Sequence, residues 1–259
     1  MEWQNIKMTV EDRVATIVID HPPANALNTP TMDELNQAID EVISNKDIKA
    51  AVITGAGMFF IAGADINEIA TIQNAQQGEE ICLKGQGIIN KIDRSPKPFI
   101  AAINGMCLGG GLELAMACHL RVCGDRAQLG QPEINLGIIP GFGGTQRLAR
   151  LVNQARAMEL ILTGDRISAQ EAYRIGLVNK VVPNMDVVKQ AVGLAKKITS
   201  KGAIAVAKAI DAIKTGYEMK LEDGLKYEAK LFGQICETAD MREGVSAFIQ
   251  KRQPKFSDK

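Results

Sequence analysis

Features that a nucleic-acid-binding or membrane protein would show are scarce in this sequence. Aromatic residues make up only 4% of the chain, which argues against platforms on which bases stack. Lysine plus arginine and aspartate plus glutamate number 30 each, so there is no bulk electrostatic attraction to nucleic acid or to an anionic membrane. No apolar run reaches the ~18 residues that a membrane-spanning helix needs. We therefore expect neither nucleic acid nor a membrane as a partner.

Motifs of several enzyme classes are also absent. The sequence contains no G-x-S-x-G nucleophile elbow and no G-x-x-x-x-G-K-[ST] phosphate loop, and neither glycine cluster completes G-x-G-x-x-G. The two histidines, His21 and His119, cannot form H-E-x-x-H, and we interpret them as a turn residue and a core or helix-end residue. The five cysteines include no C-x-x-C pair, so neither a metal site nor a redox pair is expected.

The cysteines and the start of the chain bear on the compartment. Residues 1–7 show no charged leader followed by an apolar core, so we expect neither a signal peptide nor a transit segment. Several cysteines stand in apolar surroundings, where they act as small core residues. These features predict a reduced, cytoplasmic protein.

Hydrophobic residues, by contrast, make up 46% of the 259 residues, enough for one large domain or a domain with an appendage. Periodicity and turn signals predict strands alternating with helices as far as residue 182, and helices alone after it. This order predicts an α/β fold with a C-terminal helical part, with a core domain at 1–185 and a helical region at 186–259. The predicted strands are 14–20, 49–54, 99–103, 120–123 and 177–182. The predicted helices are 30–44 (capped by Thr29), 79–93, one beginning at 112, 145–152, 154–162, 168–176, 186–200, 203–215, 221–236 and 239–251, with a loop at 128–144.

The stretch from residue 100 to residue 118 organises the chain. An apolar run with β-branched residues predicts a buried strand, which breaks at Asn104 and turns through Gly109, Gly110 and Gly111. From residue 112 the pattern predicts a helix that is apolar on nearly every face, with Glu113 in its first turn. Such a helix start offers unpaired N–H groups and partial positive charge to an oxygen that gains negative charge. The alternative is a tight connection, with Glu113 a favourable partner of the helix dipole worth about 0.3–1 kcal/mol.

Two further segments offer groups of the same kind. Ala62, Gly63 and Ala64 follow a strand and two aromatic residues, and a backbone N–H here can donate to a ligand, although Asp65 is more often the cap of a short helix than a catalytic group. Glu133 follows a proline in a mainly apolar, glycine-rich stretch. It either faces a pocket or is a solvated loop residue.

Five segments occur in an order that resembles the enoyl-CoA hydratase (crotonase) family, and the similarity extends to a C-terminal helix. They are Ile61-Ala-Gly-Ala-Asp-Ile66, Asn104-Gly-Met-Cys-Leu-Gly-Gly-Gly-Leu-Glu-Leu-Ala115, Gly130-Gln-Pro-Glu-Ile134, Pro140-Gly-Phe-Gly-Gly-Thr-Gln-Arg-Leu148 and Leu162-Thr-Gly-Asp-Arg-Ile167, followed by Arg242-Glu-Gly-Val-Ser-Ala-Phe248. The resemblance implies the crotonase fold of repeated β-β-α turns, with a C-terminal helical region for trimerisation. It also implies a homotrimer or a dimer of trimers.

The resemblance also implies the site. The oxyanion hole falls on the backbone N–H groups of Ala64 and Gly110, and the catalytic acids fall on Glu113 and Glu133. The substrate is an acyl-CoA thioester, and no metal or redox cofactor is implied. The remaining positions that the resemblance assigns to CoA or substrate binding are Ala26, Leu27, Ala62, Gly63, Asp65, Ile66 and Gly109, with Phe248 and Lys251 reaching the CoA of a neighbouring subunit.

The reaction implied is the reversible addition of water across the 2,3 double bond of a 2-enoyl-CoA, as in fatty acid β-oxidation. Two N–H donors stabilise the charge on the thioester oxygen, Glu113 orients and deprotonates the water, and Glu133 delivers the proton to C2. Isomerases, dehydratases and other enzymes share the scaffold, so the fold alone does not fix the reaction. A non-catalytic acyl-CoA-binding subunit is the remaining alternative, although such a subunit would lose an acid. The acyl pocket is expected to involve Ala70, Ile72, Ile81 and Phe142.

Overall fold

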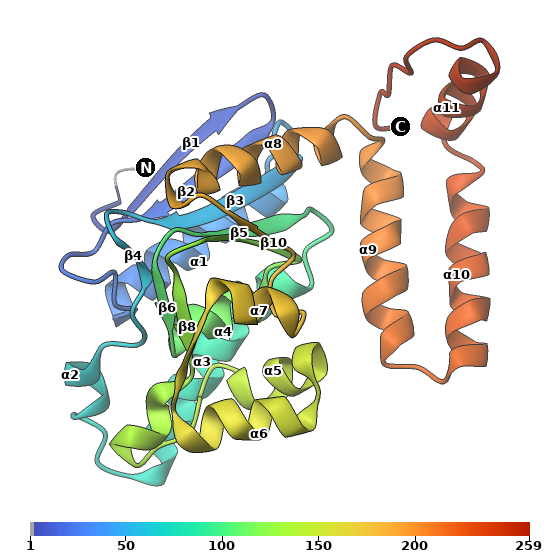
Figure 1. Cartoon of the computed structure of the whole chain (residues 1–259). Helices are drawn as coiled ribbons and strands as arrows, with labels where there is room; N and C mark the ends of the chain where they lie inside the picture. Colours follow the sequence, from blue (N-terminus) through green and yellow to red (C-terminus); the bar gives the residue numbers. More distant parts are fainter. Residues whose placement is uncertain (1–2) are drawn as a thin grey trace.

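Two β-sheets carry the fold in the computed structural model, which describes residues 3–259 (Figure 1). The larger sheet has the strand order β1-β2-β3-β5-β7-β10, and the smaller one has the order β4-β6-β8-β9. Pairs β1–β2 and β8–β9 are antiparallel and the others are parallel. The strand bounds are β1 Ile6–Glu11, β2 Val14–Ile19, β3 Ala50–Gly55, β4 Phe59–Ile61, β5 Phe99–Ile103, β6 Met106–Leu108, β7 Leu120–Gly124, β8 Gln128–Gly130, β9 Arg166–Ser168 and β10 Lys180–Val182.

The helices follow these strands in a repeated unit. Strands β3, β5 and β7 of the large sheet are each followed by a short strand of the small sheet, β4, β6 or β8, and then by a helical segment. This repetition confirms the predicted crotonase fold of β-β-α turns. The helix bounds are α1 Thr29–Ser44, α2 Ile66–Ile69, α3 Ala75–Asp93, α4 Gly110–Ala117, α5 Gly144–Val152, α6 Gln154–Thr163, α7 Ala169–Arg174, α8 Val187–Thr199, α9 Ala203–Tyr217, α10 Leu221–Ile235 and α11 Ala239–Ile249, with 3-10 helices η1 Pro132–Leu136 and η2 Asn184–Asp186.

The middle of the large sheet is covered on both faces, so its central strands β3 and β5 are buried at every position. Because side chains alternate along a strand, one set points to each face. Ile17, Ile53 and Ile103 join the main core, which includes the buried side of α1. Val52 and Ile100 join a second cluster with the buried residues of α8.

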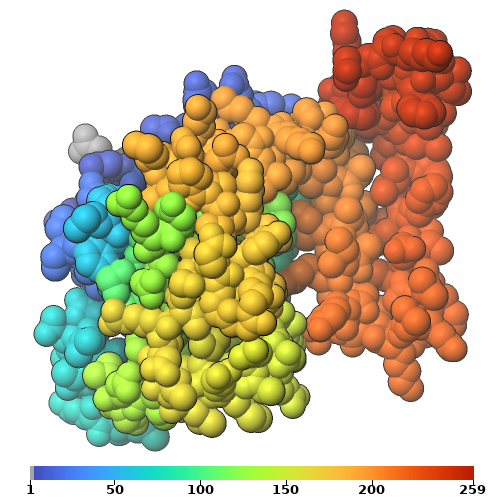
Figure 2. Space-filling view, in the orientation of Figure 1, coloured from blue at the N-terminus to red at the C-terminus, as the bar shows by residue number. Residues whose placement is uncertain are grey.

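The C-terminal helices divide into two groups. Helix α8 lies within the predicted helical region 186–259, yet it packs on the large sheet, whereas α9 and α10 form a hairpin beside the core and α11 follows at its far end (Figures 1 and 2). The last residues return to the core: Asp258 accepts hydrogen bonds from Arg13 and from the Ala203 N–H, and it forms an ion pair with Lys49 at 2.6 Å. Within residues 3–259, no helix is both long and apolar enough to cross a membrane.

Several predicted boundaries were wrong. The three-residue strands β4, β6, β8 and β9 were not predicted, since three residues are too few to show a period of two, and the six-residue strand β1 was not predicted either. Residues 132–136 of the predicted loop form η1. Helix α3 begins at residue 75 rather than 79, because Asn74 caps a polar first turn that carries no apolar periodicity. Asn28, not Thr29, caps α1 by accepting the Thr31 N–H.

Candidate active site

Glu113 lies inside the protein at the start of α4. This helix is buried at every position, and Glu113 is 2% exposed. Gly109 precedes the helix with φ 50° and ψ −126°, a backbone conformation that only glycine adopts readily. A Cβ on Gly111 would lie 2.4 Å from the carbonyl oxygen of Ile61, so the helix start packs directly on β4. These glycines bring the backbone of residues 109–111 close to the small sheet.

The loop before α5 binds the Glu113 carboxylate. Glu113 Oε1 accepts the N–H groups of Phe142 and Gly144, each at 2.7 Å. Burial raises the pKa of Glu113 to about 7, and the nearby Glu133 charge raises it as well, while the two N–H bonds and the positive charge of Arg147 act in the opposite direction. A carboxyl group with this pKa exchanges a proton readily near neutral pH.

Glu133 approaches the same helix start from η1. A Cβ on Gly109 would lie 3.0 Å from Glu133 Oε1, and a Cβ on Gly144 would lie 3.0 Å from Glu113 Oε1. Burial raises the pKa of Glu133 above its ordinary value. Its Oε2 atom is buried and has no hydrogen-bond partner among the described residues. Since buried polar atoms are nearly always hydrogen-bonded, this oxygen is available to a substrate or to water.

Two backbone N–H groups meet opposite these acids. A Cβ on Gly110 would lie 3.4 Å from the Ala64 nitrogen, so the two peptides are neighbours. Within residues 3–259, neither the Ala64 N–H nor the Gly110 N–H donates a hydrogen bond to another residue. Gly110 is the first residue of α4, where the N–H has no partner within the helix. Paired free donors of this kind suit an oxygen that gains negative charge.

Strand-like pairing joins the segment around Ala64 to the segment around Leu27. The Leu27 N–H donates to Gly63 O at 2.8 Å, the Asp65 N–H donates to Leu27 O at 3.1 Å, and the Ala62 N–H donates to Ala24 O at 3.1 Å. This ladder uses the Gly63 carbonyl and the Asp65 N–H, which lie on either side of Ala64, and it leaves the Ala64 N–H without a partner among the described residues. Thus Ala26 and Leu27, which were predicted to bind CoA, lie beside the predicted positions 62–66.

The other predicted positions are less central. Asp65 caps α2 by accepting the Asn67 N–H at 2.8 Å, and Ile66 is 59% exposed. Phe248 is 86% exposed on α11, and Lys251 follows that helix, on the opposite side of the molecule from β4 and α2 (Figure 1). The chain does not bring these two residues to its own Glu113, and their predicted contact with the CoA of a neighbouring subunit stays a prediction.

Two residues of the site escaped the sequence analysis. Gln131 is fully buried and donates to Gly109 O at 3.2 Å, while its Oε1 atom has no partner among residues 3–259. Arg147 donates to Phe142 O at 2.9 Å and so holds the loop that binds Glu113. Both stand inside segments that carried the family resemblance, and a polar side chain between glycines and apolar residues was the available signal.

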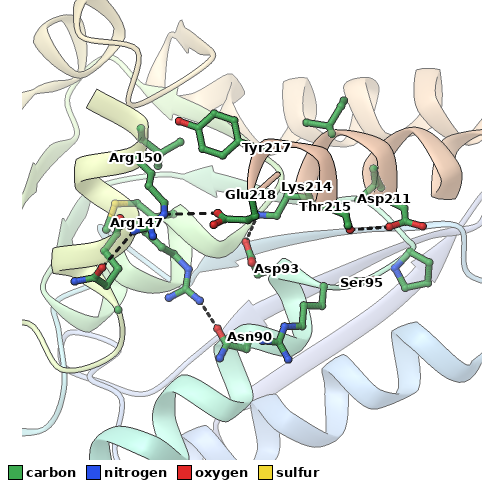
Figure 3. A pocket seen from close by; sticks show the side chains of 18 of the residues that line it. Asn90, Asp93, Ser95, Arg147, Arg150, Asp211, Lys214, Thr215, Tyr217 and Glu218 are labelled. Atoms are coloured by element: carbon green, nitrogen blue, oxygen red, sulfur yellow. Dashed lines mark hydrogen bonds and ion pairs between the residues drawn. The ribbon is translucent and has the colours of Figure 1, made fainter. Parts of the chain in front are cut away.

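A hollow of about 1210 Å³ lies behind this loop, between α3, α5 and α9. Figure 3 shows Arg147 and Arg150 on one side of it and Lys214, Tyr217 and Glu218 of the C-terminal hairpin on the other. Neither Glu113 nor Glu133 lines it. In the described part of the chain, no group of three His, Cys, Asp or Glu side chains is arranged to hold a metal ion.

Comparison with known proteins gives one consistent result. A profile of the family described as "Enoyl-CoA hydratase/isomerase" matches residues 9–259. The chain is 42% identical to a "Probable enoyl-CoA hydratase" of Bacillus subtilis over 97% of its length and 98% of that protein. It is also 42% identical to the "Short-chain-enoyl-CoA hydratase" of Clostridium acetobutylicum, covering 97% of each chain. The crystal structure of an enoyl-CoA hydratase from Bacillus anthracis superposes with a TM-score of 0.95 at 40% identity, over 99% of this chain and 100% of that one.

Proposed function

The chain belongs to the enoyl-CoA hydratase/isomerase family, and from this premise we propose that it is an enoyl-CoA hydratase, a hydro-lyase that adds water reversibly across the 2,3 double bond of 2-enoyl-CoA thioesters. One observation carries the proposal. The free N–H groups of Ala64 and Gly110 lie side by side, and the buried Glu113 and the half-buried Glu133 flank the same helix start.

In the proposed reaction the thioester oxygen accepts both N–H groups. Attack of water at C3 moves electron density onto this oxygen, and the two donors stabilise the resulting enolate. Removing one donor of such a pair typically costs about 3–4 kcal/mol of transition-state stabilisation. Because the donors are peptide groups fixed by α4 and by the ladder to Leu27, they need no rearrangement when the charge develops.

The two acids divide the proton transfers. Ionised Glu113 takes a proton from the water as the O–C3 bond forms, and protonated Glu133 gives its proton to C2, which completes the 3-hydroxyacyl-CoA. The Phe142 and Gly144 N–H groups bind one oxygen of Glu113, which leaves its other oxygen to the water. The reverse reaction uses the same groups with their roles exchanged. The addition transfers no electrons, so we propose that the reaction needs no cofactor beyond the CoA of the substrate.

A positional isomerase is the second candidate, because the family includes isomerases by description. It would move the double bond of a 3-enoyl-CoA with one acid. The retention of both acids, each with a raised pKa, favours the hydratase. The relatives' printed names favour a hydratase too, and one of them specifies short-chain substrates. Crotonyl-CoA is therefore the substrate to test first.

We propose a homotrimer or a dimer of trimers as the working form, in the cytoplasm. Large apolar side chains remain exposed on α9, α10 and α11, which argues for a second copy of the chain as the partner of this surface. Self-association would also bring Phe248 and Lys251 to a neighbouring CoA. Light scattering on the purified protein tests the assembly, and a monomer at micromolar concentration would contradict it. The exposed residues are Ile213, Tyr217, Leu221, Leu225, Phe232, Val245, Phe248 and Ile249.

The decisive assay follows the loss of the conjugated thioester absorbance of crotonyl-CoA. We expect Glu113→Gln and Glu133→Gln each to lower kcat by about 10²–10⁴-fold, since each removes one proton-transfer group. The affinity for CoA should change little, because neither side chain is assigned to the nucleotide or the pantetheine. Near-parental turnover in either variant would refute the division of roles, and absence of hydration by the parent protein would refute the function.

A further inference from the structure

The loop of residues 140–144 is anchored from behind by two helices. Gln86 of α3 donates from Nε2 to Gly141 O at 2.8 Å, and Arg147 of α5 donates from Nη1 to Phe142 O at 2.9 Å. The second guanidinium nitrogen of Arg147 donates to Asn90 Oδ1 on α3, one turn beyond Gln86 (Figure 3). Arg147 therefore ties the loop to both helices.

The guanidinium of Arg147 packs directly against the loop backbone. Gly143 has φ 108°, and a Cβ at this residue would lie only 2.2 Å from Arg147 Nη1. The backbone N–H of Arg147 also donates to Gly143 O at 2.8 Å. Only a glycine leaves room for this approach, so residues 143 and 147 fit each other as a unit.

We propose that Arg147 is a positioning residue for the hydration reaction: it holds the Phe142 carbonyl, thereby fixes the N–H groups that bind Glu113, and places a permanent positive charge behind that carboxylate. The inference rests on the proposed function for its kinetic consequences. Arg147 makes no hydrogen bond to Glu113 itself, so it acts through the backbone of Phe142 and through its charge.

Residue Phe142 is the physical link. Its carbonyl, in the peptide with Gly143, accepts a hydrogen bond from Arg147, and its N–H, in the peptide with Gly141, donates to Glu113. Holding the carbonyl fixes the backbone of Phe142 and so the direction of its N–H. The positive charge of Arg147 also lowers the pKa of Glu113, against the larger upward effect of burial. Arg147 thus keeps the buried base ionised over more of the pH range.

Other charged and titratable groups affect the pKa values of Glu113 and Arg147, but none of them supplies the positive charge that Arg147 places near Glu113. Glu133 of η1 raises the pKa of Glu113, and the Cys82 thiol of α3 is affected by the Glu113 charge. Around Arg147, burial has the largest effect and lowers its pKa, Asp93 and Glu113 favour its charged form, and Arg94 opposes it. Asp93 is itself paired with Lys214 of α9 (Figure 3). Arg147 is the cation that acts on Glu113.

Three variants separate charge from packing. Arg147→Met removes the charge at similar volume, and Arg147→Lys keeps the charge with fewer donors. Arg150→Met is the matched control, because Arg150 lies one turn along α5 and, among residues 3–259, its side chain bonds only Gln146 and Glu218. The readout is the pH profile of kcat and kcat/KM for crotonyl-CoA hydration, with thermal unfolding to check the fold. If Arg147→Met does not fold, Arg147→Gln takes its place.

For Arg147→Met we expect the pKa of Glu113 to rise by about one unit, the typical effect of losing a nearby opposite charge. At pH 6 this lowers kcat about tenfold, because a smaller fraction of Glu113 is ionised. KM should not change. Arg147→Lys should return the pH profile close to that of the parent, and Arg150→Met should leave the profile unchanged. An unchanged profile in a folded Arg147→Met protein, or equal changes in the Met and Lys variants, would overturn the inference.

A second readout does not depend on turnover. The infrared band of a protonated carboxyl group can be titrated in the parent and in Arg147→Met, with Glu113→Gln to assign the band. A higher midpoint in Arg147→Met supports the inference even if the protein does not hydrate crotonyl-CoA, in which case only the proposed function fails. Identical midpoints would refute the role of Arg147 whatever the activity.

Discussion

The burial of Glu113 has a cost in stability that depends on pH in a definite way. The pKa of Glu113 is about 7 in the folded protein and 4.5 in an unfolded chain. Between these two values the folded state binds more protons than the unfolded state, so the free energy of unfolding falls as pH rises through this window. A pKa shift of this size corresponds to about 3 kcal/mol of unfolding free energy. The folded protein has this stabilisation in full below pH 4.5 and has lost it by pH 8.

The substitution Glu113→Gln removes the charge and so makes this cost in stability measurable. The amide oxygen of glutamine can still accept the N–H groups of Phe142 and Gly144, but the side chain never becomes charged. The difference in unfolding free energy between variant and parent should be constant below pH 4.5, increase in favour of the variant from pH 4.5 to 7, and level off above pH 8. At pH 8 we expect the variant to have gained about 3 kcal/mol relative to pH 4.5. The Glu113→Gln protein, although impaired in catalysis, should thus be more stable than the parent in alkaline buffer.

The measurement is urea unfolding of both proteins at matched protein concentration from pH 4.5 to 9, followed by circular dichroism. Glu79→Gln serves as the control, because Glu79 is exposed on α3 and its loss should leave the difference flat. A flat difference curve for Glu113→Gln would show that the carboxyl group is not buried in solution. That result would remove the reason to assign proton transfer near neutral pH to Glu113.

Three further substitutions test the elements that hold the site. Gly109→Ala should lower the free energy of unfolding by about 1–3 kcal/mol and kcat by about 10²-fold, because φ 50° with ψ −126° strains any L side chain and the new Cβ meets Glu133 Oε1 at 3.0 Å. Gly57→Ala is its control, since Gly57 has φ 69° and open space around it, so kcat should not change. Asn104→Ala should cost about 2–3 kcal/mol in urea unfolding, because Nδ2 donates to Gly55 O and Gly57 O and no side chain replaces it. Asp258→Ala should cost a similar amount, about 2–3 kcal/mol, by removing the carboxylate that Lys49 and Arg13 share, and it should raise amide exchange in residues 253–259.

The long elements were predictable from residues alone, whereas the roles of the two acids came from the family resemblance. Helix α1 and strands β3 and β5 have strong periodic or continuous apolar patterns. Glu113 stood out as the one charged residue of an apolar helix, and the structure buries it. The alternative interpretation of Asp65, the cap of a short helix, is also what the structure shows. Each of these depends on local sequence, which a pattern can report.

The supporting contacts were not predictable in the same way. The hydrogen bond from Arg147 to Asn90 joins residues that are 57 positions apart, and no local pattern encodes such a contact. Strands β4, β6 and β8 are three residues long, so their pairing is set by the larger sheet and by the helices around them. The family resemblance supplied the fold that these short strands complete.

These short strands explain why the candidate catalytic groups meet although they stand far apart in sequence. Strands β4, β6 and β8 pair in parallel, so their carboxyl ends lie at one edge of the small sheet. Ala64 follows the end of β4, Gly110 and Glu113 follow the end of β6, and Glu133 follows the end of β8. The Gly109 N–H donates to Gly130 O at 3.0 Å and so extends the β6–β8 pairing up to the helix start. The same β-β-α unit, used three times, therefore brings the Ala64 N–H, the Gly110 N–H with Glu113, and Glu133 to the same place. An insertion of one residue in any of the three turns would displace its group from the other two without unfolding the sheet.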